Sequence, residues 1–142
     1  MLSNSAKYAF KSVLFLALNS NAQKRIMAKD LAESIQAPKA YVSKILQELS
    51  RQNIISSVRG PKGGFYLSTS NLDGYLIGIV LAMDGEKKLH SCVLGLEKCN
   101  EEQPCPLHDV IHPTRSRFLA YLNSETILEF TKKYPKDDQF FE

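Results

Sequence analysis

Hydrophobic residues recur at helical spacing along the first third of the chain. The first such series follows Ser3, a typical helix cap, and ends near residue 19. Residues 28–35 and 38–51 each repeat the i, i+3, i+4, i+7 pattern of a short amphipathic helix, and Pro38 suits the first helical position. Two short amphipathic helices joined by a tight turn predict a helix-turn-helix.

The pattern changes after residue 53. Residues 54–58 and 65–67 are rich in β-branched and aromatic side chains, which predicts two strands. The intervening segment, Arg59-Gly60-Pro61-Lys62-Gly63-Gly64, has the Gly and Pro content of a tight turn. A hairpin directly after a helix-turn-helix is a wing, so residues 1–70 are predicted to form a winged helix-turn-helix domain. The whole chain is predicted to be mainly α-helical with one small β-hairpin.

The second half of the chain predicts more helices. An apolar stretch over residues 72–83 predicts one helix, which residues 84–88 close, and residues 124–130 predict a last short one. Between them lies a helical region whose apolar positions suit either a dimerisation seam or an intramolecular core: Val110, Ile111, Phe118, Leu119 and Leu122. Residues 71–133 are therefore predicted to hold dimerisation helices with a cysteine-rich loop over residues 89–108, and the tail over residues 134–142 is expected to be loose.

Charge is distributed unevenly between the two halves. Residues 1–70 carry ten Lys and Arg against three Asp and Glu, a net charge of +7, whereas residues 71–142 carry a net charge of −4. This asymmetry indicates that the first half faces a polyanion. Combined with the winged helix-turn-helix, it favours double-stranded DNA as the partner. A head of this size makes few contacts, so we expect a homodimer on a palindromic operator.

The candidate DNA-binding side chains lie on the predicted recognition helix and on the wing. On the helix they occupy the face opposite the apolar stripe, where they would reach base edges and phosphates in the major groove. On the wing, two cations flank the Gly-Pro turn, and the first of them would enter a minor groove. The candidates are Lys39, Tyr41, Ser43, Lys44, Gln47 and Arg51 on the helix, with Arg59 and Lys62 on the wing.

Several other classes of function lack support in the sequence. No run of about 18 apolar residues is present, and the first residues lack the basic-then-apolar order of a signal peptide, so we expect a cytoplasmic protein. No nucleophile–base pair stands out, and the Gly-Pro-Lys-Gly-Gly turn lacks the strand–loop–helix context of a phosphate loop. The chain is therefore predicted not to be an enzyme.

The cysteines of the chain are clustered. Cys92, Cys99 and Cys105 are spaced C-x6-C-x5-C, and His108 follows one helical turn after the last. Three interpretations stay open. The first is a zinc site, although the cysteine pairs that bind zinc are usually closer in sequence. The others are a cofactor-free thiol switch and an iron–sulfur cluster, which accommodates wider spacing and needs four protein ligands. His90 and His112 lie nearby as rival ligands.

Three motifs resemble those of the Rrf-two family of regulators. They are Tyr8-Ala9, Tyr41-Val42-Ser43-Lys44-Ile45-Leu46 and Ser57-Val58-Arg59-Gly60-Pro61-Lys62-Gly63-Gly64-Phe65. The resemblance implies a homodimer joined by a long helix of the C-terminal half, and an iron–sulfur cluster held by Cys92, Cys99 and Cys105. In IscR-like members a His placed as His108 completes a 2Fe–2S cluster. In NsrR-like members an acidic residue of the partner's first helix serves a 4Fe–4S cluster, and the matching position here is Lys7, which favours the IscR-like type.

The sequence departs from the family pattern at three points. The first cysteine gap is one residue longer than is common, Ser43 replaces an acidic residue of IscR-like members, and Pro113 is expected to break or restart the dimerisation helix. The resulting hypothesis is a repressor whose operator affinity is controlled by an iron–sulfur cluster that senses iron–sulfur, redox or nitric oxide status. The alternative is a cluster-free thiol-sensing or zinc-stabilised regulator that acts with a protein partner, as CymR-like members do.

Overall fold

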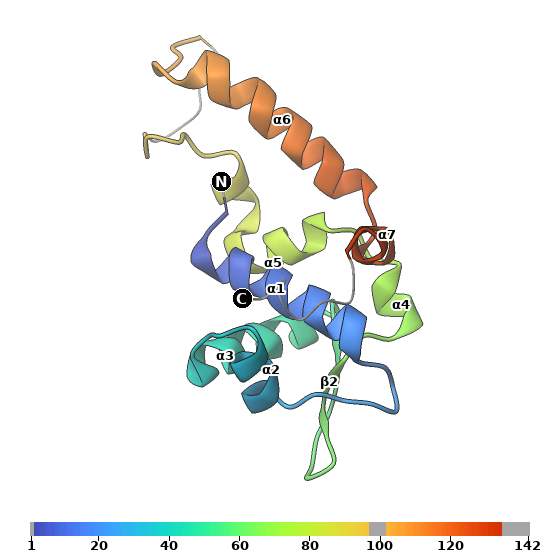
Figure 1. Cartoon of the computed structure of the whole chain (residues 1–142). Coiled ribbons are helices and arrows are strands. Elements are labelled where there is room, and N and C mark those ends of the chain that lie inside the picture. Colours follow the sequence, from blue (N-terminus) through green and yellow to red (C-terminus); the bar gives the residue numbers. More distant parts are fainter. Residues whose placement is uncertain (1, 97–101, 135–142) are drawn as a thin grey trace.

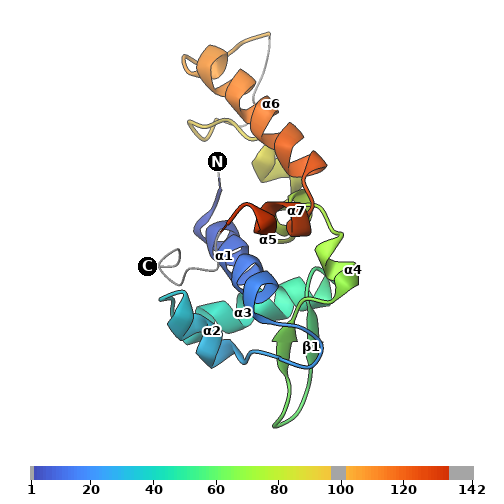
Figure 2. The same ribbon diagram turned by 45° about the vertical axis from the view of Figure 1, so that its right-hand side comes forward.

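The computed structural model describes residues 2–96 and 102–134. In this part the elements are α1 (Asn4–Asn19), α2 (Ala28–Ser34), α3 (Lys39–Arg51), β1 (Ser56–Val58), β2 (Gly64–Tyr66), α4 (Thr69–Leu72), α5 (Ile77–Leu89), α6 (His108–Ser124) and α7 (Ile127–Lys132). Helices α1, α2 and α3 gather with the hairpin at one end, and α6 extends from the other (Figures 1 and 2). The predicted fold class, mainly α-helical with one small hairpin, is confirmed.

Helix α1 is the central element of the fold. It begins where the Ser3 hydroxyl accepts a hydrogen bond from the N–H of Ala6 at 3.0 Å, a standard N-cap. Its buried stripe includes Ala9, Val13 and Leu16, and the helix packs against α3, α5 and α7. Both halves of the sequence therefore share one core around α1.

The helix-turn-helix is formed as predicted by α2 and α3. Leu31 of α2 and Leu46 of α3 are fully buried, which follows from the i, i+3, i+4 spacing of the apolar residues. Pro38 occupies the N-cap of α3, one residue before the first helical position that the sequence predicts for it. Its extended ψ of 128° turns the chain into the recognition helix.

The wing is a hairpin with a third segment beside it. β1 and β2 pair antiparallel with Ser57 opposite Phe65. On the other side of β2, Ile26 exchanges two backbone hydrogen bonds with Phe65, at 2.9 and 2.8 Å. Gly64, with φ of 146°, permits this approach, because a Cβ there would lie 2.9 Å from the carbonyl oxygen of Ile26.

The second half differs from the sequence prediction in its boundaries. The predicted helix over residues 72–83 instead begins at Ile77, because Ser68 caps a separate short helix, α4, through a capping box with Asn71. Tyr75 then forms a β-bridge with Thr126, which requires extended backbone. At the other end α5 continues to Leu89, but across a break at Gly85.

Pro113 lies inside α6, and the helix runs through it from His108 to Ser124, so the expected break or restart is wrong. Proline lacks an N–H and denies the carbonyl of Asp109 its helical partner, yet this loss falls in the second turn of the helix. Within the described residues, no helix is long and apolar enough to span a membrane. Cys99 and the tail from residue 135 lie outside the described residues, so the predictions made for them are not tested.

Candidate DNA interface and cysteine site

The recognition helix α3 presents its cations and one amide to solvent. The apolar stripe of α3 is buried against α1 and α2, which turns the opposite face outward. Four of the predicted residues on the helix are exposed: Lys39, Lys44, Gln47 and Arg51. Ser43 is half-buried. Arg59 and Lys62 of the wing are exposed as well. Six of the eight sequence-predicted residues thus form an exposed, positively charged surface.

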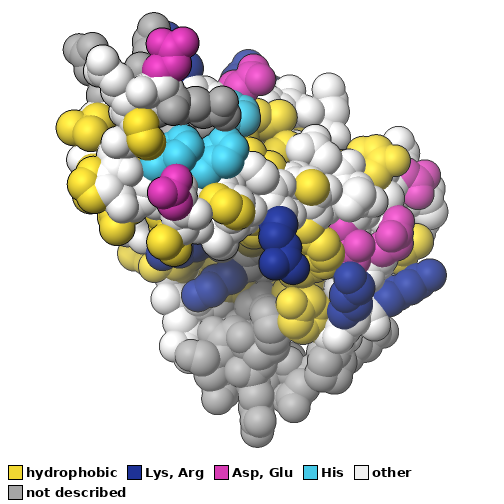
Figure 3. All heavy atoms as spheres, turned by 90° about the horizontal axis from the view of Figure 1, so that it is seen from above, with side chains coloured by type: hydrophobic (Ala, Val, Ile, Leu, Met, Phe, Trp, Pro, Cys, Tyr) yellow, Lys and Arg dark blue, Asp and Glu magenta, His cyan; other side chains and the backbone are white. Residues whose placement is uncertain are grey.

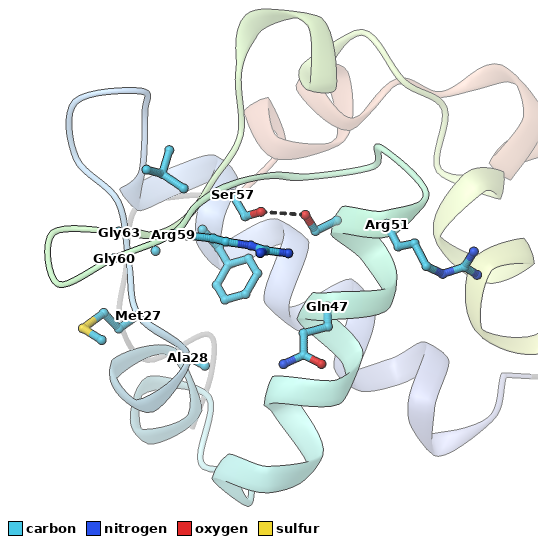
Figure 4. A pocket seen from close by; sticks show the side chains of 12 residues that line it. Met27, Ala28, Gln47, Arg51, Ser57, Arg59, Gly60 and Gly63 are labelled. Carbon is cyan, nitrogen blue, oxygen red and sulfur yellow. Dashed lines mark hydrogen bonds between the residues drawn. The ribbon is translucent and has the colours of Figure 1, made fainter.

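A groove of about 750 Å³ separates α3 from the wing and the start of α2. Figure 4 shows that Gln47 points from α3 into this groove and that Arg59 extends into it from the wing. The Ser50 and Ser57 hydroxyls join the two walls by a hydrogen bond of 2.8 Å. Met27, whose side chain is 51% exposed, lines the same groove, and sequence analysis did not single it out.

Arg51 is paired within its own helix. Its guanidinium donates to the Glu48 carboxylate, with an Nε–Oε2 distance of 3.0 Å and a second bond from Nη2. These bonds, together with one from Gln52, lower the pKa of Glu48 to about 2, and the same pair raises the pKa of Arg51. Arg51 is among the residues that line the groove, but Figure 4 shows its guanidinium pointing away from Gln47 and Arg59. Part of the positive charge predicted for this face is therefore neutralised.

Tyr41 differs from the other predicted contacts because it is half-buried against α1. Its hydroxyl lies 2.6 Å from the Ser5 hydroxyl, and its ring packs edge-on against Tyr8, with 5.4 Å between ring centroids. Tyr41 thus joins α3 to the start of α1. The tyrosines lie 33 positions apart, so helical periodicity gives no signal for this contact.

The start of α1 is also joined to the break in α5. The Asp84 carboxylate accepts hydrogen bonds from the backbone N–H of Ser3, at 3.1 Å, and from the Ser3 hydroxyl. The next residue, Gly85, has φ of 71° and ψ of 166°, a backbone conformation available essentially only to glycine. Ser3 and Ser5 therefore link the break in α5 to the recognition helix.

Two of the three predicted sulfur ligands come together in the structure. Cys92 follows α5 and is 5% exposed, and the side chain of Cys105, just before α6, lies near enough to help lower the pKa of the Cys92 thiol. The backbone N–H of His108 donates to the Cys105 carbonyl at 3.0 Å, and the ring of His108 stacks on His112 at 4.9 Å. Among the described residues no three His, Cys, Asp or Glu side chains gather as a metal site, and Cys99 lies outside that part of the chain.

Hydrogen bonding stabilises the thiolate form of Cys92. The backbone of Leu94 hydrogen-bonds its sulfur and is the largest cause that lowers the pKa of Cys92 below its usual value. Burial opposes this effect, whereas Leu96, Cys105 and the positive charge of Arg115 act in the same direction. A thiolate is the form that binds metals and reacts with oxidants.

Apolar side chains are exposed around this cysteine pair. Val110, in the first turn of α6, is 69% exposed, and Val93, Leu94 and Leu96 after Cys92 and Leu107 after Cys105 are exposed as well. Figure 3, viewed toward the α6 end of the molecule, shows hydrophobic side chains around adjoining histidines. Several large apolar side chains exposed in one region are typical of an interface with another protein chain.

A winged helix-turn-helix with a charged recognition face, joined to a helical extension, defines a DNA-binding transcription regulator. The sequence profile of the Rrf2 family, described as an iron-dependent transcriptional regulator, matches residues 2–133. The chain belongs to this family, which is the Rrf-two family that its motifs resemble. Members of the family bind DNA, are typically dimeric and are not enzymes, which confirms the expectation that this chain is not an enzyme.

Named relatives agree with this assignment. An HTH-type transcriptional regulator of Aquifex aeolicus is 28% identical over 130 residues, which cover 89% of this chain and 88% of the relative. IscR of Vibrio campbellii is 28% identical over 131 residues, covering 92% and 77%.

Solved structures share the fold. CymR, the global cysteine regulator of B. subtilis, has a TM-score of 0.73 at 18% identity, with 95% of this chain and 98% of CymR covered. IscR of T. potens has a TM-score of 0.66 at 17% identity, with 99% and 96% covered. Likeness to both an IscR and a CymR structure shows the fold and does not separate the two types of regulator.

Proposed function

We propose that this chain is a homodimeric transcriptional repressor whose affinity for a palindromic operator is controlled by an iron–sulfur cluster. Residues 1–70 bind DNA, and residues 71–133 hold the cysteine site and the dimer contacts. The observation that carries the sensor part is the proximity of the Cys92 and Cys105 side chains, which are separated by twelve residues in the sequence. The family profile, described as iron-dependent, and the IscR relatives support the same assignment.

The DNA-binding part rests on the exposed face of α3 and on the wing. Gln47 suits recognition of adenine, because its amide both donates and accepts hydrogen bonds at the adenine edge in the major groove. Lys39, Lys44 and Lys62 suit phosphate contacts, and Arg59 suits the minor groove beside the recognition helix. Ser43 supplies a short polar side chain at the same face. Tyr41 contributes by positioning α3 through its bond to Ser5.

The donors present fit an iron–sulfur cluster. Cys92 and Cys105 supply two thiolates, and Cys99 and His108 are the proposed remaining ligands of a 2Fe–2S cluster, with a 4Fe–4S cluster as the alternative. Hydrogen bonds from backbone N–H groups to a ligand sulfur, as at Cys92, are a recurrent way of tuning such sites. When bound, the cluster would supply a redox-active centre that is lost or altered under oxidation, nitric oxide or iron limitation.

A structural path joins this site to the recognition helix. Cys92 follows α5, whose break at Gly85 adjoins Asp84, and Asp84 holds Ser3. Two residues further on, Ser5 holds Tyr41 of α3. A shift of the segment that carries Cys92 would therefore reach α3 through the first turn of α1. The path begins at the proposed cluster site and ends at the DNA-binding helix, the two sites that would have to be coupled.

A second candidate function rests on the same two thiols. The side chains of Cys92 and Cys105 lie near each other, so a two-electron oxidant such as a peroxide would convert the two thiols to a disulfide with loss of two protons and two electrons. This chemistry needs no metal and would make the chain a thiol sensor that acts with a protein partner. The likeness of its fold to CymR, a cysteine regulator, favours keeping this alternative.

Spectroscopy of protein purified without oxygen separates the two candidates. The cluster proposal predicts visible absorbance with bound iron and acid-labile sulfide, and loss of most of that absorbance in Cys92→Ala, Cys99→Ala and Cys105→Ala. Ser91→Ala is the matched control, because it changes an adjacent side chain that supplies no sulfur. Wild-type protein that is colourless and iron-free, or cysteine variants that keep full absorbance, would overturn the cluster proposal.

A further inference from the structure

The loop between α1 and α2 lies along the wing, and Arg25 ties the two together. Its Nη1–H donates to the carbonyl oxygen of Lys62 at the wing tip, at 3.1 Å. Its Nε–H donates to the carbonyl oxygen of Ala22 within the loop, also at 3.1 Å. The neighbouring Ile26 pairs with Phe65 of β2. One guanidinium thus braces the wing against a segment 37 residues earlier in the chain.

The loop is itself a closed turn. The side-chain oxygen of Asn21 accepts hydrogen bonds from the N–H groups of Gln23, at 2.9 Å, and Lys24, at 2.7 Å. The backbones of Asn21 and Lys24 also exchange two hydrogen bonds, at 3.0 and 3.1 Å. These bonds satisfy the polar groups of the turn locally, and they leave the side chain of Lys24 exposed.

The loop and the wing together concentrate positive charge. Lys24 and Arg25 in the loop join Arg59 and Lys62 in the wing, and the sequence places no Asp or Glu at residues 1–29 or 49–72. Arg25 uses two of the five N–H donors of its guanidinium for the two carbonyl bonds, and a further acceptor such as a phosphate oxygen suits the others.

We infer that the loop over residues 21–25 is a second DNA-backbone contact beside the wing, and that Arg25 holds the wing in its DNA-binding position while it contacts a phosphate. The inference rests on the DNA binding proposed above and adds to it residues that the helix and wing motifs do not include. Bracing matters because a wing that is already in place loses less conformational entropy on binding. Lysine cannot replace this arginine, because its single ammonium lacks the planar fork that reaches two carbonyls at once.

The test uses full-length protein and a DNA duplex that the wild-type protein has selected from a random-sequence pool. Dissociation constants are measured over a range of salt concentrations for Arg25→Ala and Arg25→Lys, with Lys132→Ala, an exposed change on α7 outside the proposed interface, as the control. Arg25→Lys keeps the charge, so we expect an unchanged salt slope with about threefold to tenfold weaker binding. Arg25→Ala should bind at least as weakly, with a salt slope that is smaller by about one.

Amide hydrogen exchange of residues 63–65 reports the brace directly. It should become faster in both Arg25 variants and stay at the wild-type rate in Lys24→Ala, which removes a charge from the same loop without touching the wing. If Arg25→Lys binds and exchanges as the wild-type protein does, the inference is wrong while the proposed function stands. If the wild-type protein selects no DNA, the proposed function fails and this inference falls with it.

Discussion

Glu48 controls how much of the positive charge of the recognition helix is available to DNA. It is the one acidic residue in the α3 sequence, and its carboxylate holds the guanidinium of Arg51. With a pKa of about 2, well below the ordinary value of a glutamate, the carboxylate stays charged near neutral pH. The pair would be lost only as the pH falls toward 2, so it is intact wherever the protein would bind DNA.

Glu48→Gln is therefore predicted to strengthen DNA binding. The change removes a negative charge that repels phosphate and releases Arg51, so affinity should rise about threefold or more and the salt slope should steepen by about one. Fluorescence anisotropy with a labelled duplex at several salt concentrations measures both quantities. Asp73→Asn, a neutralising change at an exposed turn outside α3, is the control. Equal affinities for Glu48→Gln and wild-type protein would contradict the role given to this carboxylate.

At this scale the sequence predicts residue types better than it predicts their orientation. Four of the six candidate contacts on α3 are exposed because the apolar stripe of the helix fixes which way the other side chains point, and the two on the wing are exposed in its turn. The contact of Tyr41 with α1 was not predicted, because a tyrosine can lie either in the buried stripe or on the exposed face of a helix. Its partner Ser5 also lies 36 residues away in the sequence. The brace of Arg25 was not predicted either, because its acceptor is equally remote in sequence.

Helix α5 is interrupted at Gly85, where the backbone has a conformation that favours glycine. Gly85, with φ of 71° and ψ of 166°, lies where a side chain would strain the backbone, although no atom lies within 4 Å of a Cβ built there. Gly85→Ala is predicted to destabilise the fold by about 1–3 kcal/mol through this backbone strain alone. Thermal unfolding followed by circular dichroism measures the loss.

Gly78→Ala is the matched control in the same helix. Its Cβ also meets no atom within 4 Å, but its backbone has no positive φ. Alanine there should leave stability unchanged or raise it by up to about 1 kcal/mol, because alanine has the higher helix propensity. If both variants unfold at the wild-type temperature, the break in α5 is not held by the conformation of Gly85.

Elements with strong periodicity were predicted well, and elements set by long-range contacts were not. Helices α1, α2 and α3 and the wing follow from spacing and turn residues. The start of α5 differs from the prediction because Leu72 belongs to the separate helix α4, and the bridge of Tyr75 to Thr126, about fifty residues later, interrupts the helical backbone before Ile77. Pro113 was expected to break α6, but one lost hydrogen bond did not end a helix of 17 residues.

For the whole molecule, the exposed apolar surface at the start of α6 predicts self-association. The proposed dimer would cover Val110 and the apolar residues beside it, and burial of that surface supplies the driving force. Val110→Glu would place a charge in the interface, so we expect the variant to have the mass of a monomer in sedimentation at concentrations at which the wild-type protein is a dimer. Ser116→Glu, an exposed change elsewhere on α6, should remain dimeric. A monomeric wild-type protein would contradict the proposed dimer.

The most direct test of the whole account compares the DNA affinity of cluster-bound and cluster-free protein. Both forms are prepared without oxygen, the second by iron chelation, and titrated into the same selected duplex. We predict that the two affinities differ at least about fivefold, the lower end of typical coupling between sites. The difference should shrink in Tyr41→Phe, which lacks the hydroxyl that bonds Ser5. Equal affinities for the two wild-type forms would contradict control of DNA binding by a cluster.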